Sequence, residues 1–279
     1  MNLRVRLIRF AGMKILDGNK TLTNLVANKI LTSLRIQRDS KTYIVLRRIY
    51  RKTGKVHKIE ISHSSFGEDR VLVKYLPELD GRYVDVGAGA PVNGSNTYLF
   101  YERGWRGTTL DPIHSLVQSH KRQRPRDKQI QACVGNGDDK EKEFFEYLAD
   151  DFSTNSQRRV VQLFSEGIKP HKSYLSAVIK LRNLNFHCNP TSPSLLNIDV
   201  EGSELDVLLS NDWDVCKPRV IAVEEWVSPI YVKTEVRKYL EKMDYELTSR
   251  CFLTSVYVHK LYLETLTDGG NEKLVKNQE

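Results

Sequence analysis

Residues 82–91 read Arg82-Tyr-Val-Asp-Val-Gly-Ala-Gly-Ala-Pro91, and this stretch decides the fold of the chain. Tyr83 to Val86 form a short apolar run that contains one acid, Asp85, and such a run predicts a buried strand. Gly87 and Gly89 let the backbone turn sharply beneath a ligand. A strand, a glycine turn and a helix in this order are how an α/β fold holds a cofactor that contains adenosine.

The elements that follow fit the same unit. Ser95 or Asn96 is expected to cap a helix that starts at about Thr97 and ends at Gly104. A second strand, residues 107–110, ends on Asp111, whose carboxylate can accept hydrogen bonds from both ribose hydroxyls. An ordinary helix cap before a proline is a compatible interpretation of this acid.

The glycine spacing argues against a dinucleotide. The third glycine of a dinucleotide fingerprint would fall on Val92, and Pro91 removes a backbone donor that a pyrophosphate could use. S-adenosylmethionine carries no phosphate, and it needs only the turn, an acid for the ribose and acids for its amine and sulfonium. We therefore expect this cofactor rather than a nicotinamide dinucleotide.

Two further apolar runs also end in acids. Residues 194–198 lead into Asp199-Val-Glu201, and residues 220–223 lead into Glu224-Glu225. Because ligands bind at the carboxyl ends of parallel strands, these acids are expected to meet Asp85 at one edge of a sheet.

A neutral hydroxyl is a poor nucleophile, so a nearby base would speed transfer of the methyl group of S-adenosylmethionine to it by roughly a hundredfold to ten-thousandfold. Asp199, Glu201 and Glu224 are the candidates for this catalytic role, in that order. Glu201 can instead be an acid that the helix dipole favours, and Glu225 is expected to be a solvated surface acid.

Other interpretations of these side chains stay open. The same three acids are hard oxygen donors that could hold Mg²⁺ or Ca²⁺, although nothing in the sequence fixes a set of metal ligands. His114 could serve as the base, but it is expected on the surface of the helix after Pro112. His187, beside Cys188, is expected to be structural.

The motifs together resemble the FkbM-type family of S-adenosylmethionine-dependent methyltransferases. The resemblance covers about residues 62–260, and one departure is Gly89, where an asparagine is expected in the family. The segments that carry it are Val84-Asp-Val-Gly-Ala-Gly-Ala-Pro91, Ser95-Asn-Thr-Tyr98, Arg103-Gly-Trp-Arg-Gly107, Leu110-Asp-Pro112, Leu196-Asn-Ile-Asp-Val-Glu-Gly-Ser-Glu-Leu205 and Pro218-Arg-Val-Ile-Ala-Val-Glu224.

The resemblance implies a Rossmann-like class I methyltransferase fold, α/β, with a mostly parallel seven-stranded sheet and an antiparallel closing strand. It also implies methylation of a hydroxyl group on a sugar of a glycan or on a natural product. The expected cofactor-binding residues are Asp85, Gly87, Ala88, Gly89, Ser95, Asn96, Asp111, Pro112, Cys133, Val134 and Asp199.

The charge of the chain predicts its division into segments. Residues 1–76 hold 17 Lys and Arg against 5 Asp and Glu, whereas residues 77–279 hold 26 against 30, so the net charge of +8 comes from the N-terminal part. We expect a basic, partly helical extension over residues 1–61, a methyltransferase domain over residues 62–262 and a flexible tail over residues 263–279.

The basic extension is expected to pack on the domain, or to approach an anionic membrane surface or an acidic glycan. A role for it in binding nucleic acid is less expected, because no aromatic stacking platform accompanies the charge.

The rest of the chain gives further expectations of secondary structure. Residues 129–134 predict one strand whose exit lies near the adenine, residues 140–147 a strand or hairpin, and residues 150–170 a loop over the pocket. Residues 173–184 and 234–243 predict helices, and residues 245–249 and 251–259 an antiparallel closing pair. A helix from about Ser203 is expected to bury Leu205, Leu208 and Leu209.

The sequence also bears on the compartment. No apolar run approaches the roughly 20 residues that cross a bilayer, and no signal-peptide pattern is present. The four cysteines lack Cys-x-x-Cys spacing, which fits a reducing cytoplasm and argues against a zinc ribbon.

The sequence therefore predicts a cytoplasmic S-adenosylmethionine-dependent O-methyltransferase that acts on a sugar hydroxyl. The alternatives are a nucleic-acid methyltransferase that uses the basic N-terminal segment, and a non-catalytic binding module on the same fold.

Overall fold

The computed structural model describes residues 62–149, 152–226 and 233–266. The chain divides into two units, Met1–Ile61 and Ser62–Glu279, and everything described lies in the second. The predicted basic extension and residues 267–279 of the predicted C-terminal tail therefore lie outside the described residues, whereas residues 263–266, predicted to be part of the flexible tail, are helical. Among the described helices, none is long and apolar enough to cross a membrane.

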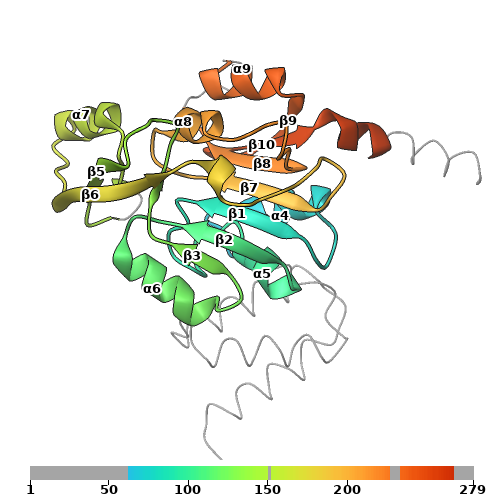
Figure 1. Cartoon of the computed structure of the whole chain (residues 1–279), viewed down its shortest axis with the longest axis horizontal. Coiled ribbons are helices and arrows are strands. Elements are labelled where there is room, and N and C mark those ends of the chain that lie inside the picture. Colours follow the sequence, from blue (N-terminus) through green and yellow to red (C-terminus); the bar gives the residue numbers. More distant parts are fainter. Residues whose placement is uncertain (1–61, 150–151, 227–232, 267–279) are drawn as a thin grey trace, which may run out of the picture. The chain divides into compact units, whose positions relative to one another are not determined.

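A seven-stranded sheet forms the centre of the described domain (Figure 1). The strands β3-β2-β1-β7-β8-β10-β9 lie side by side in this order, and all are parallel except β10, which runs antiparallel to both of its neighbours. Their bounds are β1 (Arg82–Val86), β2 (Arg106–Leu110), β3 (Lys128–Ile130), β7 (Ser194–Ile198), β8 (Val220–Glu224), β9 (Tyr245–Cys251) and β10 (Thr254–His259). This topology confirms the expected fold class and the antiparallel closing pair.

Helices cover both faces of the sheet, because successive side chains of a strand point to opposite faces. Val84 and Val86 of β1 join the core that includes α8 (Glu204–Leu209) and α9 (Glu235–Lys242). Tyr83 joins the core of the other face, with α4 (Glu68–Tyr75) and α5 (Tyr98–Arg103). The helices predicted near residues 97–104 and 234–243 are thus present.

One detail of the predicted packing of α8 is wrong. Val207 and Leu208 are fully buried, whereas Leu209 is 40% exposed. The buried face of the helix consists of Glu204, Val207 and Leu208. It is therefore shifted by one residue toward the N-terminus from the predicted face.

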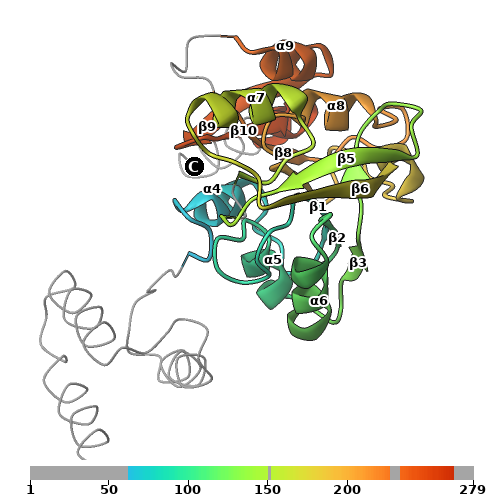
Figure 2. The ribbon, with the colours of Figure 1, turned by 90° about the vertical axis from the view of Figure 1, so that its left-hand side faces the viewer.

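A second, three-stranded sheet lies to one side of the central sheet, with α7 beside it (Figures 1 and 2). It consists of β4 (Cys133–Val134), β6 (Lys172–Ile179) and β5 (Glu141–Glu146), and α7 spans Gln157–Ser165. The predicted strand at residues 129–134 is therefore two strands, β3 and β4, in different sheets. The predicted loop at residues 150–170 contains a helix, which Ser156 caps by accepting a hydrogen bond from the backbone of Arg159.

The helix predicted for residues 173–184 is wrong, since this segment forms β6 and a short 3-10 helix, Leu181–Asn183. Along β6, Tyr174 and Val178 pack with Phe144 of β5, and the two strands pair antiparallel. Tertiary pairing with β5 outweighs the weak helical spacing of the apolar residues.

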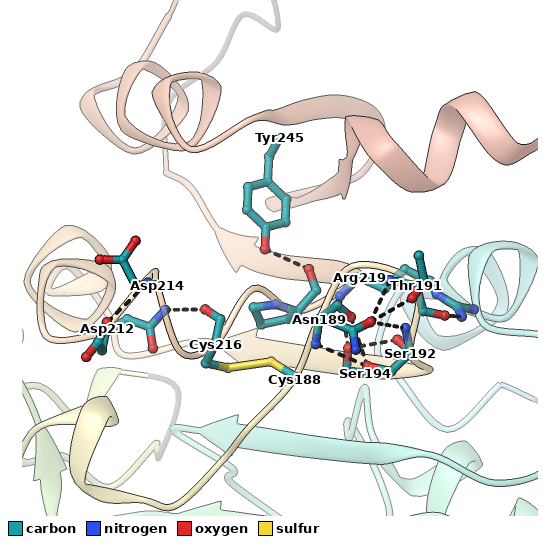
Figure 3. The surroundings of a disulfide bond; sticks show 12 residues. Cys188, Asn189, Thr191, Ser192, Ser194, Asp212, Asp214, Cys216, Arg219 and Tyr245 are labelled. Carbon is teal, nitrogen blue, oxygen red and sulfur yellow. Dashed lines mark hydrogen bonds between the residues drawn. A yellow bond between two sulfur atoms is a disulfide. The ribbon is translucent and has the colours of Figure 1, made fainter.

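A disulfide joins Cys188 and Cys216, which are 28 residues apart (Figure 3). Cys188 precedes β7 and Cys216 precedes β8, so the bond lies at the edge of the sheet where these strands begin. Cys133 and Cys251 carry free thiols. This pairing corrects the interpretation of the cysteines as scattered thiols, because the fold brings two distant loops together.

Candidate active site

A cavity of about 430 Å³ opens at the carboxyl ends of β1, β2, β7 and β8. From β1 the chain builds outward to β2 and β3 on one side and later to β7 and β8 on the other, and such a switch point is where open α/β sheets bind ligands. The cavity is lined by all the residues predicted from the sequence, namely Asp85, Gly87, Ala88, Gly89, Ser95, Asn96, Asp111, Pro112, Cys133, Val134, Asp199, Glu201 and Glu224. Among the described residues that line it there is no Lys, Arg or His.

The glycine turn forms the floor of the cavity. Gly87 has φ +72°, and a Cβ added there would lie 1.6 Å from the carbonyl oxygen of Asp199, so no other residue fits without a shift of the backbone. Gly89 has φ +54°, and a Cβ added there would meet no atom within 4 Å. The first glycine is required by the fold, whereas the second leaves open space.

Both sides of Gly89 are held by buried side chains. Its N–H donates to Asp111 Oδ2 at 3.0 Å, and its carbonyl accepts from His120 Nε2 at 3.0 Å. Burial, together with the charge of Arg124, lowers the pKa of His120 to about 4, so the imidazole is neutral at pH 7. His120 lies on α6 (His114–Gln123) and is 1% exposed, which identifies it as a positioning residue for the turn.

Asp111 also holds the start of the next element. Its Oδ1 accepts a hydrogen bond from the backbone of Ile113 at 2.8 Å, as in the cap interpretation. Because a carboxylate can accept about four hydrogen bonds, these two backbone contacts are compatible with the predicted contact to a ribose.

Asp85 lies at the base of the cavity, and its carboxylate forms hydrogen bonds with other side chains of the protein. It is 2% exposed, and its oxygens accept hydrogen bonds from Thr97 Oγ1 at 2.5 Å and Asn197 Nδ2 at 2.8 Å. Arg124 lies 4.0 Å from it and forms a closer ion pair with Asp127, at 3.1 Å. Burial raises the pKa of Asp85, which the sequence alone could not show.

Ser95 and Asn96 fix the first turn of α5. The Ser95 hydroxyl accepts hydrogen bonds from the backbone of Thr97 and Tyr98, although Thr97 occupies the N-cap position itself. Asn96 Nδ2 donates to Asn197 Oδ1 at 3.1 Å. The N-cap is therefore Thr97 and not Ser95 or Asn96 as predicted, although the Ser95 side chain does accept hydrogen bonds from the backbone at the start of the helix.

Three carboxylates meet above the glycine turn. Asp199, Glu201 and Glu224 each have a carboxylate oxygen within 4.8 Å of the others. The carboxyl groups of Asp199 and Glu224 are neighbours in this cluster, so a charge on one disfavours a charge on the other. Burial and the neighbouring Glu224 raise the pKa of Asp199 well above its usual range, and burial with the charge of Glu201 raises the pKa of Glu224 to about 7.

Glu201 is held in a constrained backbone conformation, with φ +56°. Its carbonyl accepts from Thr154 Oγ1 at 2.8 Å, and its Oε2 lies 3.6 Å from Arg159 Nη2. The interpretation as a helix N-terminal acid fits another residue better, because Glu204 opens α8 and accepts a hydrogen bond from the backbone of Gly202.

The expectation for Glu225 is wrong, whereas the expectation for His114 is confirmed. Glu225, expected to be solvated, is 6% exposed and accepts hydrogen bonds from Thr234 and from the Tyr257 hydroxyl, the latter at 2.7 Å. Thr234, the N-cap residue of α9, lies against Glu225 just after the end of β8 and helps to bury this acid. His114 is exposed and contacts Gln131 at 2.9 Å, outside the cavity, as expected for a surface residue.

The far wall of the cavity is apolar. Pro112, Cys133 and Val134 line it together with Ile113 and Phe144. Burial raises the pKa of the Cys133 thiol to about 11, so the thiol is neutral and contributes an apolar surface. This wall suits a flat heteroaromatic ring such as adenine.

Several residues of the site were not predicted. His120 lies on α6, and Arg124, four residues later, is the C-cap residue of that helix, so the pair could have been found from helical spacing. Phe66 and Phe252 come from segments far apart in the chain and carry no local signal. Trp226 directly follows the acids at the end of β8, and its Nε1 donates to Glu224 Oε2 at 3.1 Å.

The residues present fit S-adenosylmethionine. The acids over the turn would hold its positive sulfonium and amine, Asp111 would hold the ribose, and the apolar wall would hold the adenine. The three acids are also spaced as a set of ligands for a cation, an alternative left open by the sequence.

Comparisons with known proteins bear on this site. The model of the methyltransferase FkbM domain matches residues 85–247. The solved structure of a TehB-like SAM-dependent methyltransferase from Corynebacterium glutamicum ATCC 13032 Kitasato is 11% identical to this chain, with a TM-score of 0.39. The alignment covers 78% of this chain and 97% of that one. No curated protein matches the chain.

Proposed function

Since the chain belongs to the FkbM family of S-adenosylmethionine-dependent methyltransferases, we propose that it transfers the methyl group to a hydroxyl oxygen of a sugar. The sugar would belong to a glycan or to a natural product.

The observation that carries the proposal is the charge of the cavity. Asp199, Glu201 and Glu224 converge there, and no basic side chain lies among the described residues that line it. Such a site attracts a ligand of net positive charge and disfavours an acceptor of net negative charge. It therefore supports a cationic methyl donor and an uncharged hydroxyl as the acceptor.

The carboxyl pair provides the base. When bound, S-adenosylmethionine supplies an electrophilic methyl group that the acceptor oxygen takes up as the bond to sulfur breaks. The deprotonated carboxylate of the Asp199 and Glu224 pair would accept the hydroxyl proton during this step. Because burial and the charge of Glu201 raise the pKa of Glu224 to about 7, the pair is a stronger base than an ordinary carboxylate, and a base of this kind contributes about a hundredfold to ten-thousandfold.

The same pair supports transfer to oxygen rather than to nitrogen. A hydroxyl keeps its proton at neutral pH and gains from a base in contact with it, whereas a neutral amine needs no base to attack.

Purified protein incubated with ¹³C-methyl-labelled S-adenosylmethionine and a glycan extract of its own cells tests the proposal. We expect a labelled sugar whose methyl carbon has the NMR shift of an O-methyl group. A label on nucleic acid, on nitrogen, or on no product would contradict it. Asp199→Asn should lower turnover far more than affinity for S-adenosylhomocysteine, and a fully active variant would remove the base role.

Partners and compartment are further parts of the proposal. A contact between the basic extension and an anionic membrane surface depends on residues 1–61, which lie outside the described residues. The cytoplasm remains the predicted compartment, but the Cys188–Cys216 disulfide favours an oxidising one. Alkylation of protein taken directly from its cells decides between them, because reduced protein exposes two more reactive thiols than oxidised protein.

A further inference from the structure

Three aromatic side chains stand at the mouth of the cavity although water surrounds much of their surface. Phe66 is 60% exposed, Phe252 is 64% exposed and Trp226 is 46% exposed, and all three line the cavity. The rings of Phe66 and Phe252 contact each other, with centroids 4.4 Å apart. Exposed aromatic rings beside a pocket mark a binding surface more often than rings scattered singly.

Phe252 has a backbone conformation that is unfavourable for a residue with a bulky side chain. It lies in the two-residue turn between the paired residues Cys251 and Thr254, and its φ is +51°. Glycine or asparagine usually fills such a position, and a bulky residue there is an outlier. The backbone conformation gains nothing from phenylalanine, and the ring is mostly in solvent, so stability does not explain this residue.

Phe66 is presented by a well-fixed segment. Asp69 is fully buried, and its carboxylate accepts hydrogen bonds from the Ser62 and Ser64 hydroxyls and from the backbone of His63. The backbone N–H of Phe66 donates to Glu68 Oε2 at 2.8 Å. The exposed ring therefore stands on a rigid support close to the glycine turn.

Hydroxyl-binding oxygens lie next to these rings. The carboxylates of Glu68 and Glu224 line the same cavity, and Trp226 is bound to Glu224. An aromatic face receives C–H groups, and a carboxylate accepts hydrogen bonds from hydroxyls. A pyranose ring has both features, with an apolar C–H face and hydroxyls at its edge.

We propose that Phe66 and Phe252 form the acceptor platform, on which an uncharged sugar ring stacks while its hydroxyl reaches the carboxylates below. This inference rests on the proposed function and adds the class of the acceptor residue. Uronic acids and phosphorylated sugars are excluded from the platform, because the carboxylates around it repel a negative group.

Saturation-transfer NMR tests the platform with defined probes. Methyl α-mannoside, methyl α-rhamnoside, methyl β-galactoside and methyl β-glucuronide are each added at about 10 mM, a concentration suited to millimolar affinity, with protein saturated by S-adenosylhomocysteine. We expect transfer to the ring C–H protons of at least one neutral glycoside and little to the glucuronide.

Phe252→Gly and Phe66→Ala should each reduce this transfer by about tenfold, the effect of losing one well-packed aromatic contact. Phe252→Gly should not lower the melting temperature, because glycine relieves the strained φ, and a lowered one would indicate a structural role instead. Phe164→Ala is the matched control, since Phe164 is 62% exposed on α7 and does not line the cavity.

The outcomes separate this inference from the function on which it rests. Protein that fails to bind S-adenosylhomocysteine contradicts the proposed function. Protein that binds it overturns the platform if no neutral glycoside receives transfer, if the glucuronide receives as much, or if both aromatic variants behave as Phe164→Ala does.

Discussion

Binding of the cationic cofactor should release protons from the carboxyl cluster. Glu224 has a pKa raised to about 7, so it is half protonated at pH 7, and burial also raises the pKa of its neighbour Asp199. A positive sulfonium placed near these groups favours their charged form and lowers their pKa values. S-adenosylhomocysteine lacks that charge, and it should cause a smaller release.

The size of the difference follows from the pKa. An opposite charge close to a carboxylate lowers its pKa by about 1 to 3 units, and a fall of one unit, from about 7 to about 6, reduces the protonated fraction at pH 7 from one half to about one tenth. Glu224 alone then gives up about 0.4 proton per bound cofactor, and Asp199 adds to this value.

Isothermal titration calorimetry in phosphate and in Tris measures the release, because the two buffers differ in ionisation enthalpy. We expect S-adenosylmethionine to release at least about 0.4 proton more than S-adenosylhomocysteine at pH 7, and Glu224→Gln to remove most of this difference. Glu235→Gln is the control, since Glu235 is exposed on α9. Equal release for the two ligands in the unmodified protein would refute the assignment of the cluster to the sulfonium.

Three further predictions concern affinity and stability. Asp111→Ala should weaken S-adenosylhomocysteine binding by at least about tenfold in calorimetry but weaken its 2′,3′-dideoxy analogue much less; equal losses would assign the effect to the glycine turn alone. Gly89→Asn should keep the melting temperature within about 4 °C, because asparagine tolerates a φ of +54° and has open space there, and a larger fall would show that the turn cannot accept a side chain. Cys188→Ser combined with Cys216→Ser should lower the free energy of unfolding by about 3.6 kcal/mol, from the 28-residue separation, and unchanged denaturation curves would show that the cross-link does not form.

The central sheet could be predicted from the sequence because its signals are local and mutually consistent. Each of β1, β7 and β8 is a largely apolar run, as expected for strands buried on both faces, and each has an acid at or beside its carboxyl end. Once the strands are parallel, the acids at their ends must share one edge. The convergence of Asp85, Asp199 and Glu224 therefore needed no contact information.

The second sheet could not be predicted in the same way. β6 pairs with β5, a partner more than twenty residues earlier. Its positions alternate between exposed and more buried, but Leu175 is exposed and Ser176 is buried, so the hydrophobicity of the residues does not follow this alternation. Segments of this kind take their structure from what they pair with, so sequence spacing alone gave a helix where the fold has a strand. The disulfide is a similar case, because loop approach rather than cysteine spacing brings Cys188 to Cys216.

The environments of the acids show a third limit of prediction from the sequence. Glu224 and Glu225 are adjacent, yet Glu224 faces the cavity and Glu225 is buried against Thr234 and Tyr257. Adjacent residues of a strand point to opposite faces, so one of the two had to leave the cavity, but the sequence does not say which element covers the other. The raised pKa of Glu224 comes from burial and from Glu201, which lies on a different loop. The position of a base can thus be predicted from strand ends, whereas its proton affinity depends on neighbours that only the fold supplies.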